Sequence, residues 1–272
     1  MDKSAIMQIQ ETANIPELLK QLETAKFPVA VFPKDFYVES LEQFMPERNQ
    51  FRGWMKTANI DEFIRYNEKY AQPGNECFID ASKMTGRTIF DLGTKENPGH
   101  CYHKASLALK ATAAFNALTA INEERCGQKQ LAEWIEDYAV FLEVFAVDGS
   151  KIEIPIASAA VRNMNFEARA GRESSVDDFS QRQSEYESIA VRTKDELPMP
   201  AVFKFKCEPY LGLPERVFEM RMSTIGNETL ILRIKNLEQH QEEMGVQFMD
   251  ILTGKFKEEE IDVATFIGSF SE

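Results

Sequence analysis

The residues best suited to chemistry lie in one short run, His100-Cys101-Tyr102-His103. Imidazole and thiolate are ligands that Zn²⁺ and other borderline metals prefer. We expect residues 100–109 to form a strand, on which Cys101 and His103 share one face while His100 points to the other. Three adjacent ligands cannot complete a tetrahedron alone. We therefore interpret them as half-buried side chains and predict no metal site.

Acid–base or nucleophilic catalysis would have to use the same run. The chain has only one further histidine, His240, so His103 is the candidate base, with Cys101 or Tyr102 as its partner. The sequence has no Walker A loop, Gly-x-Gly-x-x-Gly turn, Gly-x-Ser-x-Gly elbow or His-Glu-x-x-His motif. We predict no catalytic residue and no cofactor, and keep an enzyme centred on His103 as an alternative.

Cysteine usage agrees with that reading. The four cysteines are scattered and form no Cys-x-x-Cys pair: Cys77, Cys101, Cys126 and Cys207. This spacing in a chain of 272 residues is typical of reduced thiols in a cytosolic protein.

Two groups of carboxylates are the remaining candidates for metal ligands. Glu133, Glu136 and Asp137 have helical spacing, but they lie opposite the apolar face and no histidine accompanies them. Di-metal carboxylate sites instead face the interior of a helix bundle. We interpret this cluster and Glu258-Glu259-Glu260 as solvated surface.

Cations near the end of the chain predict a basic face on a sheet. They alternate with apolar residues that we expect to point inward: Lys204, Lys206, Arg221, Arg233 and Lys235, with Arg216 beside them. Cations with aromatic neighbours can hold single-stranded nucleic acid. We favour ordinary outward-facing charges and keep nucleic-acid binding as the alternative.

Hydrophobic periodicity indicates the elements that position these residues. A helical period predicts a helix over residues 128–145, with Leu131, Trp134, Leu142 and Phe145 among the residues on one face. Period-two alternation predicts a strand through Phe203, Phe205 and Cys207, and a hairpin over 217–235 that turns at Gly226-Asn227. A helix follows, and we expect it to end at Gly254.

Before these elements the pattern is mostly helical. Residues 2–26 are expected to be helical and 28–38 extended. Asn59 and Glu62 resemble a capping box that begins a short helix. Residues 77–80 and 88–92 are candidate strands with Gly86 between them. The expected class is α+β, with a helix-rich N-terminal half and a mostly antiparallel sheet in the C-terminal half, closed by a helix.

Length and charge limit the number of domains and the classes of partner that we expect. We expect a single domain over 1–272, with a subdivision into 1–95, 96–254 and an acidic tail 255–272 as the alternative. The net charge of −13 disfavours a general DNA- or RNA-coating protein. No run approaches about 18 apolar residues, so we predict no membrane span. The segment 167–196 is polar, and we interpret it as an exposed ribbon or hairpin.

Negative charge is concentrated at the end of the chain. Residues 237–272 carry nine acidic residues and two lysines, which gives 2 − 9 = −7. Such a segment suits a basic partner, and it permits imitation of the charge of DNA.

Three segments carry a family resemblance: Tyr102 to Leu107, Gln128 to Asp137, and the paired strands 200–207 and 217–235. They resemble a phage and prophage family of unknown function, the YfdQ-like proteins. The resemblance implies a bacterial cytoplasm and a phage-related role near DNA recombination or replication, and it assigns no catalytic residue. We therefore expect a non-enzymatic accessory protein that binds a host or phage protein and self-associates as a homo-oligomer.

Overall fold

The computed structural model describes residues 42, 46–48, 50–166, 191–193, 197–225 and 229–271. The chain divides into two units, Met1–Phe51 and Arg52–Glu272, and the elements below belong to the second. The helices and strand expected within 2–38, the turn at Gly226-Asn227 and most of the segment 167–196 lie outside the described residues.

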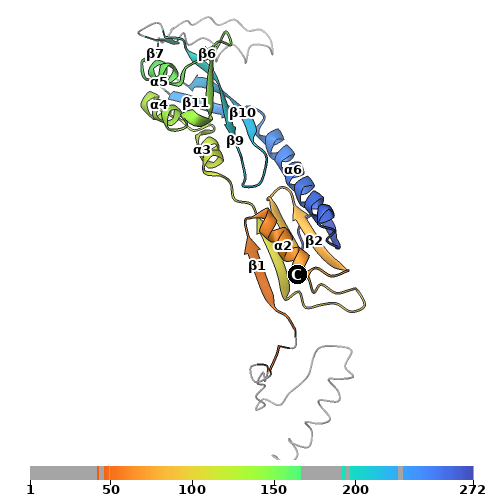
Figure 1. Ribbon diagram of the computed structural model, residues 1–272. Helices are drawn as coiled ribbons and strands as arrows, with labels where there is room; N and C mark the ends of the chain where they lie inside the picture. Colours follow the sequence, from red (N-terminus) through yellow and green to blue (C-terminus); the bar gives the residue numbers. More distant parts are fainter. Residues whose placement is uncertain are drawn as a thin grey trace, which may run out of the picture. The chain divides into compact units, whose positions relative to one another are not determined.

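The first sheet has five strands in the order β1-β4-β3-β2-β12. They are β1 (Gly53–Thr57), β2 (Asn75–Asp80), β3 (Thr85–Ile89), β4 (His103–Ala108) and β12 (Val263–Ile267). The pairs β1–β4 and β2–β12 are parallel, and the pairs between them are antiparallel. Helix α2 (Ile60–Tyr70) lies across one face of this sheet (Figure 1).

Helix α2 forms as its sequence predicts. The side chain of Asn59 accepts a hydrogen bond from the backbone N–H of Glu62 at 3.0 Å, which satisfies one of the free donors at the helix start. Phe63, Ile64 and Asn67 are buried on the predicted face. The cap and the apolar stripe together dock the helix on the sheet.

Helix α6 (Leu237–Glu258) packs on the same face of the first sheet. A Cβ atom built on Gly86 would lie 3.3 Å from Leu252, so the glycine lets this helix approach the sheet closely. Phe256 meets Phe63 of α2 edge-on, with ring centroids 6.2 Å apart. The prediction that this helix ends at Gly254 is wrong, because burial of Phe256 offsets the modest cost of an interior glycine.

The second sheet is antiparallel throughout, in the order β11-β10-β9-β5-β6. Its strands are β5 (Leu142–Ala146), β6 (Lys151–Ile152), β9 (Pro200–Cys207), β10 (Arg216–Ile225) and β11 (Thr229–Ile234). Phe203, Phe205 and Cys207 are buried on alternate positions as predicted. Pairing of β10 with β11 confirms the predicted hairpin strands.

Three helices accompany the second sheet: α3 (Ala113–Ile121), α4 (Gln128–Asp137) and α5 (Ile154–Arg162). Helices α4 and α5 pack against each other, as Figure 1 shows. A short antiparallel pair, β7 (Met164–Phe166) and β8 (Val191–Thr193), completes the described elements of the second unit. The α+β class and the mostly antiparallel second half are therefore confirmed.

The predicted helix over 128–145 is wrong in its last part. Helix α4 ends at Asp137, a 3-10 turn η2 (Ala139–Phe141) follows, and residues from Leu142 onward form β5. Leu142 and Val144 are buried while Glu143 between them is exposed, which is the alternation of a strand. Leu142 and Phe145 continued the helical spacing only by coincidence.

Three further boundaries differ from expectation. Gly86 lies inside β3 instead of between two strands. Residues 100–102 precede β4, because the left-handed backbone of Cys101 (φ 53°) interrupts an extended run. Within the range 255–272, which the alternative subdivision sets apart as an acidic tail, Lys255–Glu258 complete α6 and Val263–Ile267 form β12. Among the described helices, none has the length and apolar character needed to cross a membrane.

Packing of α6 on the first sheet gives a direct prediction. We expect Leu252→Ala to lower the free energy of unfolding by about 2–5 kcal/mol, because it removes a buried side chain and leaves a cavity. Val246→Ala is the control on the same helix, since its side chain is 53% exposed. We expect that control to stay within about 0.5 kcal/mol of the parent protein. Chemical denaturation followed by circular dichroism measures both, and equal losses would contradict this packing.

Candidate functional site

The structure places His103 in the core, on the inner face of β4. Its side chain is buried, and its Nε2 lies 3.0 Å from the hydroxyl oxygen of Tyr66. The rings of Phe90 and Tyr70 lie 4.4 and 5.2 Å from the imidazole centroid. An aromatic cluster from α2 and the segment after β3 therefore surrounds this histidine.

Burial sets the charge state of His103. Desolvation lowers the pKa of its imidazole, and the nearby Asp91 carboxylate opposes this to a smaller extent. That carboxylate accepts hydrogen bonds from the backbone N–H groups of Tyr102 and His103, at 2.8 and 2.9 Å. Asp91 therefore holds the backbone in place where β4 begins. Burial, which is the larger effect, favours the neutral form of the imidazole.

The rest of the predicted run does not join His103 as the strand prediction implies. Cys101 precedes β4, so strand alternation does not place it on the face of His103. Tyr102 is 48% exposed and stacks on His100 with ring centroids 5.3 Å apart. The run is divided between the core and the surface.

The buried thiols are poor nucleophiles. Desolvation raises the pKa of Cys77 to about 12 and that of Cys207 to about 11, and it also raises the pKa of Cys126. A thiol with a raised pKa carries little thiolate near neutral pH.

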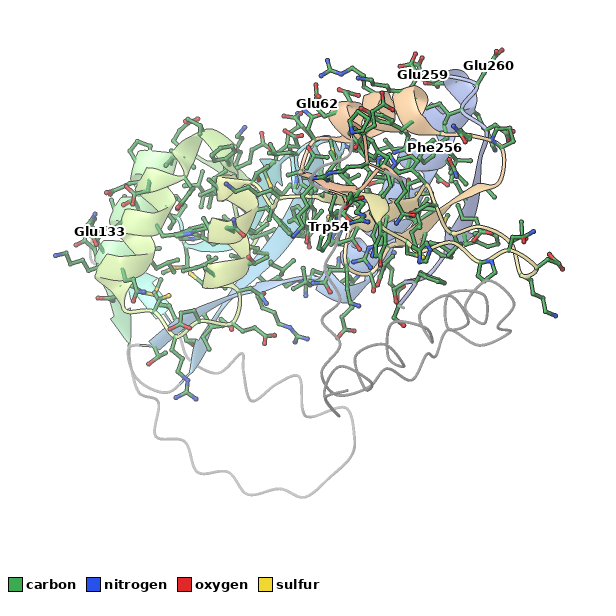
Figure 2. The ribbon with its side chains drawn as sticks, turned by 90° about the horizontal axis from the view of Figure 1, so that it is seen from below. Trp54, Glu62, Glu133, Phe256, Glu259 and Glu260 are labelled. Carbon is green, nitrogen blue, oxygen red and sulfur yellow. The ribbon has the colours of Figure 1, made fainter. Side chains whose placement is uncertain are left out.

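The carboxylates of α4 either link this helix to α5 or lie exposed on its surface. Glu136 pairs with Arg162 of α5 at 2.8 Å and accepts a hydrogen bond from Ser158, while Glu133 is exposed on the outer side of α4 (Figure 2). The described ranges of the chain contain no group of three His, Cys, Asp or Glu residues arranged to hold a metal ion.

The predicted basic residues of the second sheet are largely neutralised by neighbours. Ion pairs join Lys206 to Glu215 at 2.7 Å, Lys235 to Glu219 at 3.5 Å and Arg233 to Glu123 at 3.4 Å. Lys204 lies between two glutamates in the strand register, Glu143 and Glu219, and Arg221 lies opposite Arg233. Positive and negative side chains are therefore mixed on this face of the second sheet.

Arg216 does not belong to that face. It lies on the same side of β10 as Phe218, and its side chain is only 12% exposed. It pairs with Glu243 and contacts His240 at 3.0 Å. The prediction that Arg216 lies beside the other cations is therefore wrong. Its guanidinium instead links β10 to α6 through the ion pair with Glu243.

A different surface, the outer face of the first sheet, gathers aromatic and cationic side chains. The strand register aligns four of them with one serine in a line across all five strands: Lys56, Ser106, Arg87, Phe78 and Phe266. Residues in register on neighbouring strands point to the same face. This line, which we name the aromatic–cationic row, spans about 19 Å, from four spacings of about 4.8 Å.

Trp54 lies against the row at its β1 end. Its indole N–H donates to the hydroxyl of Ser106 at 2.8 Å, and 53% of the residue remains exposed. The ammonium of Lys56 lies 3.6 Å from the ring centroid and the guanidinium of Arg87 lies 5.9 Å from it. Figure 2 shows Trp54 on the strand side, away from Glu62 of α2 and from Glu259, which follows α6.

Stacked phenylalanines form the other end of the row. Phe78 stacks on Phe266 and on Phe270, with centroids 5.6 and 4.8 Å apart. The guanidinium of Arg87 donates to the backbone carbonyl of Phe270 at 3.3 Å. Between Trp54 and these rings the surface is hollowed to about 450 Å³.

The cations of the row differ from those of the second sheet. In the part of the chain that the structure describes, neither Lys56 nor Arg87 pairs with a carboxylate. The nearby Asp80 is paired with Lys83 at 3.2 Å. The row therefore offers unneutralised positive charge beside exposed aromatic surface.

Comparison with known proteins places the chain in a family. The family described as "Uncharacterized conserved protein (DUF2303)" matches residues 2–270. The chain belongs to the DUF2303 family. No curated protein and no solved structure matches it. The matched range includes both sheets and the aromatic–cationic row.

Sequence reasoning missed this DUF2303 surface because its residues are scattered. Trp54 and Lys56 lie on β1, and Phe266 lies on β12, two strands that the hydrophobic pattern did not predict. The available signal was the short alternation in Gly53-Trp54-Met55-Lys56-Thr57, which exposes every second residue.

The neutral His103 generates a prediction for stability against pH. The unfolded chain binds a proton near the ordinary histidine pKa of about 6.5, whereas the folded chain binds it only at lower pH. The free energy of unfolding should therefore fall as pH falls below about 6.5, down to the pKa of the folded state. In His103→Gln this part of the slope should be lost.

Urea unfolding at several pH values between about 5 and 8 measures this slope. His240, whose pKa is also lowered by burial, is present in both proteins and cancels in the comparison. His100→Gln, which alters an exposed side chain, is the control and should follow the parent curve. A His103→Gln curve parallel to the parent would contradict a buried neutral imidazole.

Proposed function

We propose that this DUF2303 protein is a non-enzymatic binding protein that holds single-stranded nucleic acid on the outer face of its first sheet. The observation that carries the proposal is the aromatic–cationic row, in which two cations that lack a carboxylate partner lie between the exposed ring of Trp54 and the stacked rings of Phe78 and Phe266. Stacking platforms beside a positive groove are the usual means of holding a single strand.

The aromatic groups suit unpaired bases. Trp54 is more than half exposed, and its hydrogen bond to Ser106 fixes the plane of the indole. Phe266 is 47% exposed, and its ring stacks on that of Phe78 on the neighbouring strand. Bases can stack on such rings only when they are unstacked from one another, so a single strand fits and a duplex does not.

The cations suit phosphate at a small number of positions. Lys56 and Arg87 occupy the β1 and β3 positions of the row, with Trp54 beside both. The net charge of −13 argues against a long footprint on duplex DNA, which draws its affinity from many phosphate contacts. It does not oppose a short local contact of two cations with one strand.

Two rival readings receive less support. Four of the basic residues of the second sheet, Lys204, Lys206, Arg233 and Lys235, lie beside carboxylates that compete with phosphate, and the fifth, Arg221, lies opposite Arg233. An enzyme centred on His103 would need an accessible imidazole, and this one is enclosed by Tyr66, Tyr70 and Phe90.

We further propose that the protein acts as a phage or prophage accessory in a bacterial cytoplasm, near DNA recombination or replication. The similarity of Tyr102–Leu107, Gln128–Asp137 and the paired strands 200–207 and 217–235 to the YfdQ-like proteins supports this setting. Single-stranded intermediates are the natural ligand of a protein in such a setting. The acidic residues within 237–272 suit a basic protein partner in the same setting.

Removing the exposed indole tests the stacking contribution. We expect Trp54→Ala to weaken binding of a labelled oligothymidylate about 5- to 150-fold, which corresponds to about 1–3 kcal/mol for one stacked base. Fluorescence anisotropy at low salt measures the affinity, and an oligouridylate separates RNA from DNA. Phe145→Ala is the control, because Phe145 is the aromatic residue beneath Lys204 on the second sheet.

Three outcomes would overturn the proposal. They are absence of binding by the parent protein at low salt, an unchanged affinity in Trp54→Ala, or a greater loss in Phe145→Ala. Thermal unfolding of each variant verifies that the comparison is made between folded proteins.

Removing the cations tests the phosphate contribution separately. We expect the double variant Lys56→Gln/Arg87→Gln to reduce the slope of log affinity against log salt by about 1.4, since each phosphate contact on a single strand contributes about 0.7. Lys204→Gln/Lys206→Gln carries the same change of charge on the second sheet and should leave the slope unchanged. The reverse result would move the site to the second sheet.

A further inference from the structure

Strand β12 is an exposed edge of the first sheet. In the described part of the chain it pairs with β2 alone and stands last in the strand order. Its backbone donors and acceptors on the outer side therefore lack a strand partner. Four of its five residues, from Ala264 to Ile267, are exposed, and Ile267 is 63% exposed.

This edge lacks the devices that normally prevent strand pairing. Proteins protect edges with charged side chains, proline, bulges or a covering element. The strand Val263-Ala264-Thr265-Phe266-Ile267 contains no charge and no proline, and its register with β2 is regular. The opposite edge, β1, carries Lys56. The first sheet thus has one protected edge and one edge open to addition.

We propose that a second copy of this chain adds its own β12 to this edge, antiparallel and related by a two-fold axis at Thr265. Such an interface uses the same surface on both copies. In this register Val263 of each copy faces Ile267 of the other, Ala264 faces Phe266, and Thr265 faces Thr265. β-branched and aromatic pairs of this kind stabilise antiparallel strands.

Charge favours this register for a second copy. Two copies that each carry −13 repel at long range, so an interface between them must avoid opposed carboxylates. The proposed register opposes only uncharged side chains within β12, and its nearest acid, Asp262, falls opposite Gly268. A five-residue strand forms a small interface, so we expect a weak dimer with a dissociation constant on the order of 10 μM.

The dimer has a consequence for the surface described above, and this consequence alone rests on the proposed function. A two-fold axis perpendicular to the sheet keeps the outer faces of both copies on the same side. The two aromatic–cationic rows then lie on one ten-stranded sheet, twice the five strands of each copy. One strand of nucleic acid in contact with both rows would bind more tightly than a single row allows.

Charge substitution at the two-fold axis tests the dimer without nucleic acid. Thr265→Lys and Thr265→Glu each place two like charges opposite one another, so each variant alone should sediment as a monomer. An equimolar mixture of the two should restore the dimer, because Lys then faces Glu. Thr265→Val keeps strand propensity without charge and should dimerise like the parent protein. Sedimentation velocity between about 1 and 200 μM covers the expected range.

Each outcome decides the proposal. A monomeric parent protein across that range would overturn it, as would single variants that dimerise like the parent, or a mixture that stays monomeric. Pairing of β12 with another segment of the same chain would give the first of these results. Circular dichroism of each variant verifies that loss of the dimer is not loss of the fold. The sedimentation result stands whether or not the protein binds nucleic acid.

Discussion

Coverage of one face of the first sheet by two helices is the constraint on which the rest of the second unit depends. Leu252 of α6 reaches the sheet over Gly86, and Phe63 of α2 meets Phe256 of α6 above it. Apolar burial holds both helices on that face. The described chain supplies no helix for the other face, so the side chains that the register places there are exposed, as Trp54 is, or half-buried, as Arg87 is.

The same packing explains why the most reactive residue types in the sequence are not the candidate site. His103 points to the helix-covered face, where Tyr66 satisfies its Nε2 and burial favours the neutral imidazole. Cys77 lies buried on the same face with a pKa raised to about 12. Catalysis requires a group that meets substrate and changes protonation near working pH. Both groups here are stabilised in their uncharged forms.

Local patterns predicted the elements that one window of sequence determines. The cap at Asn59 and the alternation at Phe203 and Phe205 lie within single elements, and both were predicted correctly. Strand β12 was missed because residues on both of its faces are exposed, and β1 was missed because one of its two outward positions holds the apolar Trp54. Both features weaken the alternation of apolar and polar positions. The aromatic–cationic row needs the register of five strands from residues 56 to 266, and no local pattern contains that information.

The choice between the two cationic surfaces depends on how each cation is paired locally, and not on the net charge of the chain. The cations of the second sheet were visible in the sequence, yet Glu123, Glu215 and Glu219 lie within ion-pair distance of them. A phosphate there would have to displace a carboxylate already in place, and the exchange of one anion for another gains little. Lys56 lies on an indole instead, where the attraction between cation and ring leaves the positive charge available to an incoming anion. This difference in neighbours is why we propose the outer face of the first sheet, and not the second sheet, as the surface that would hold a polyanion.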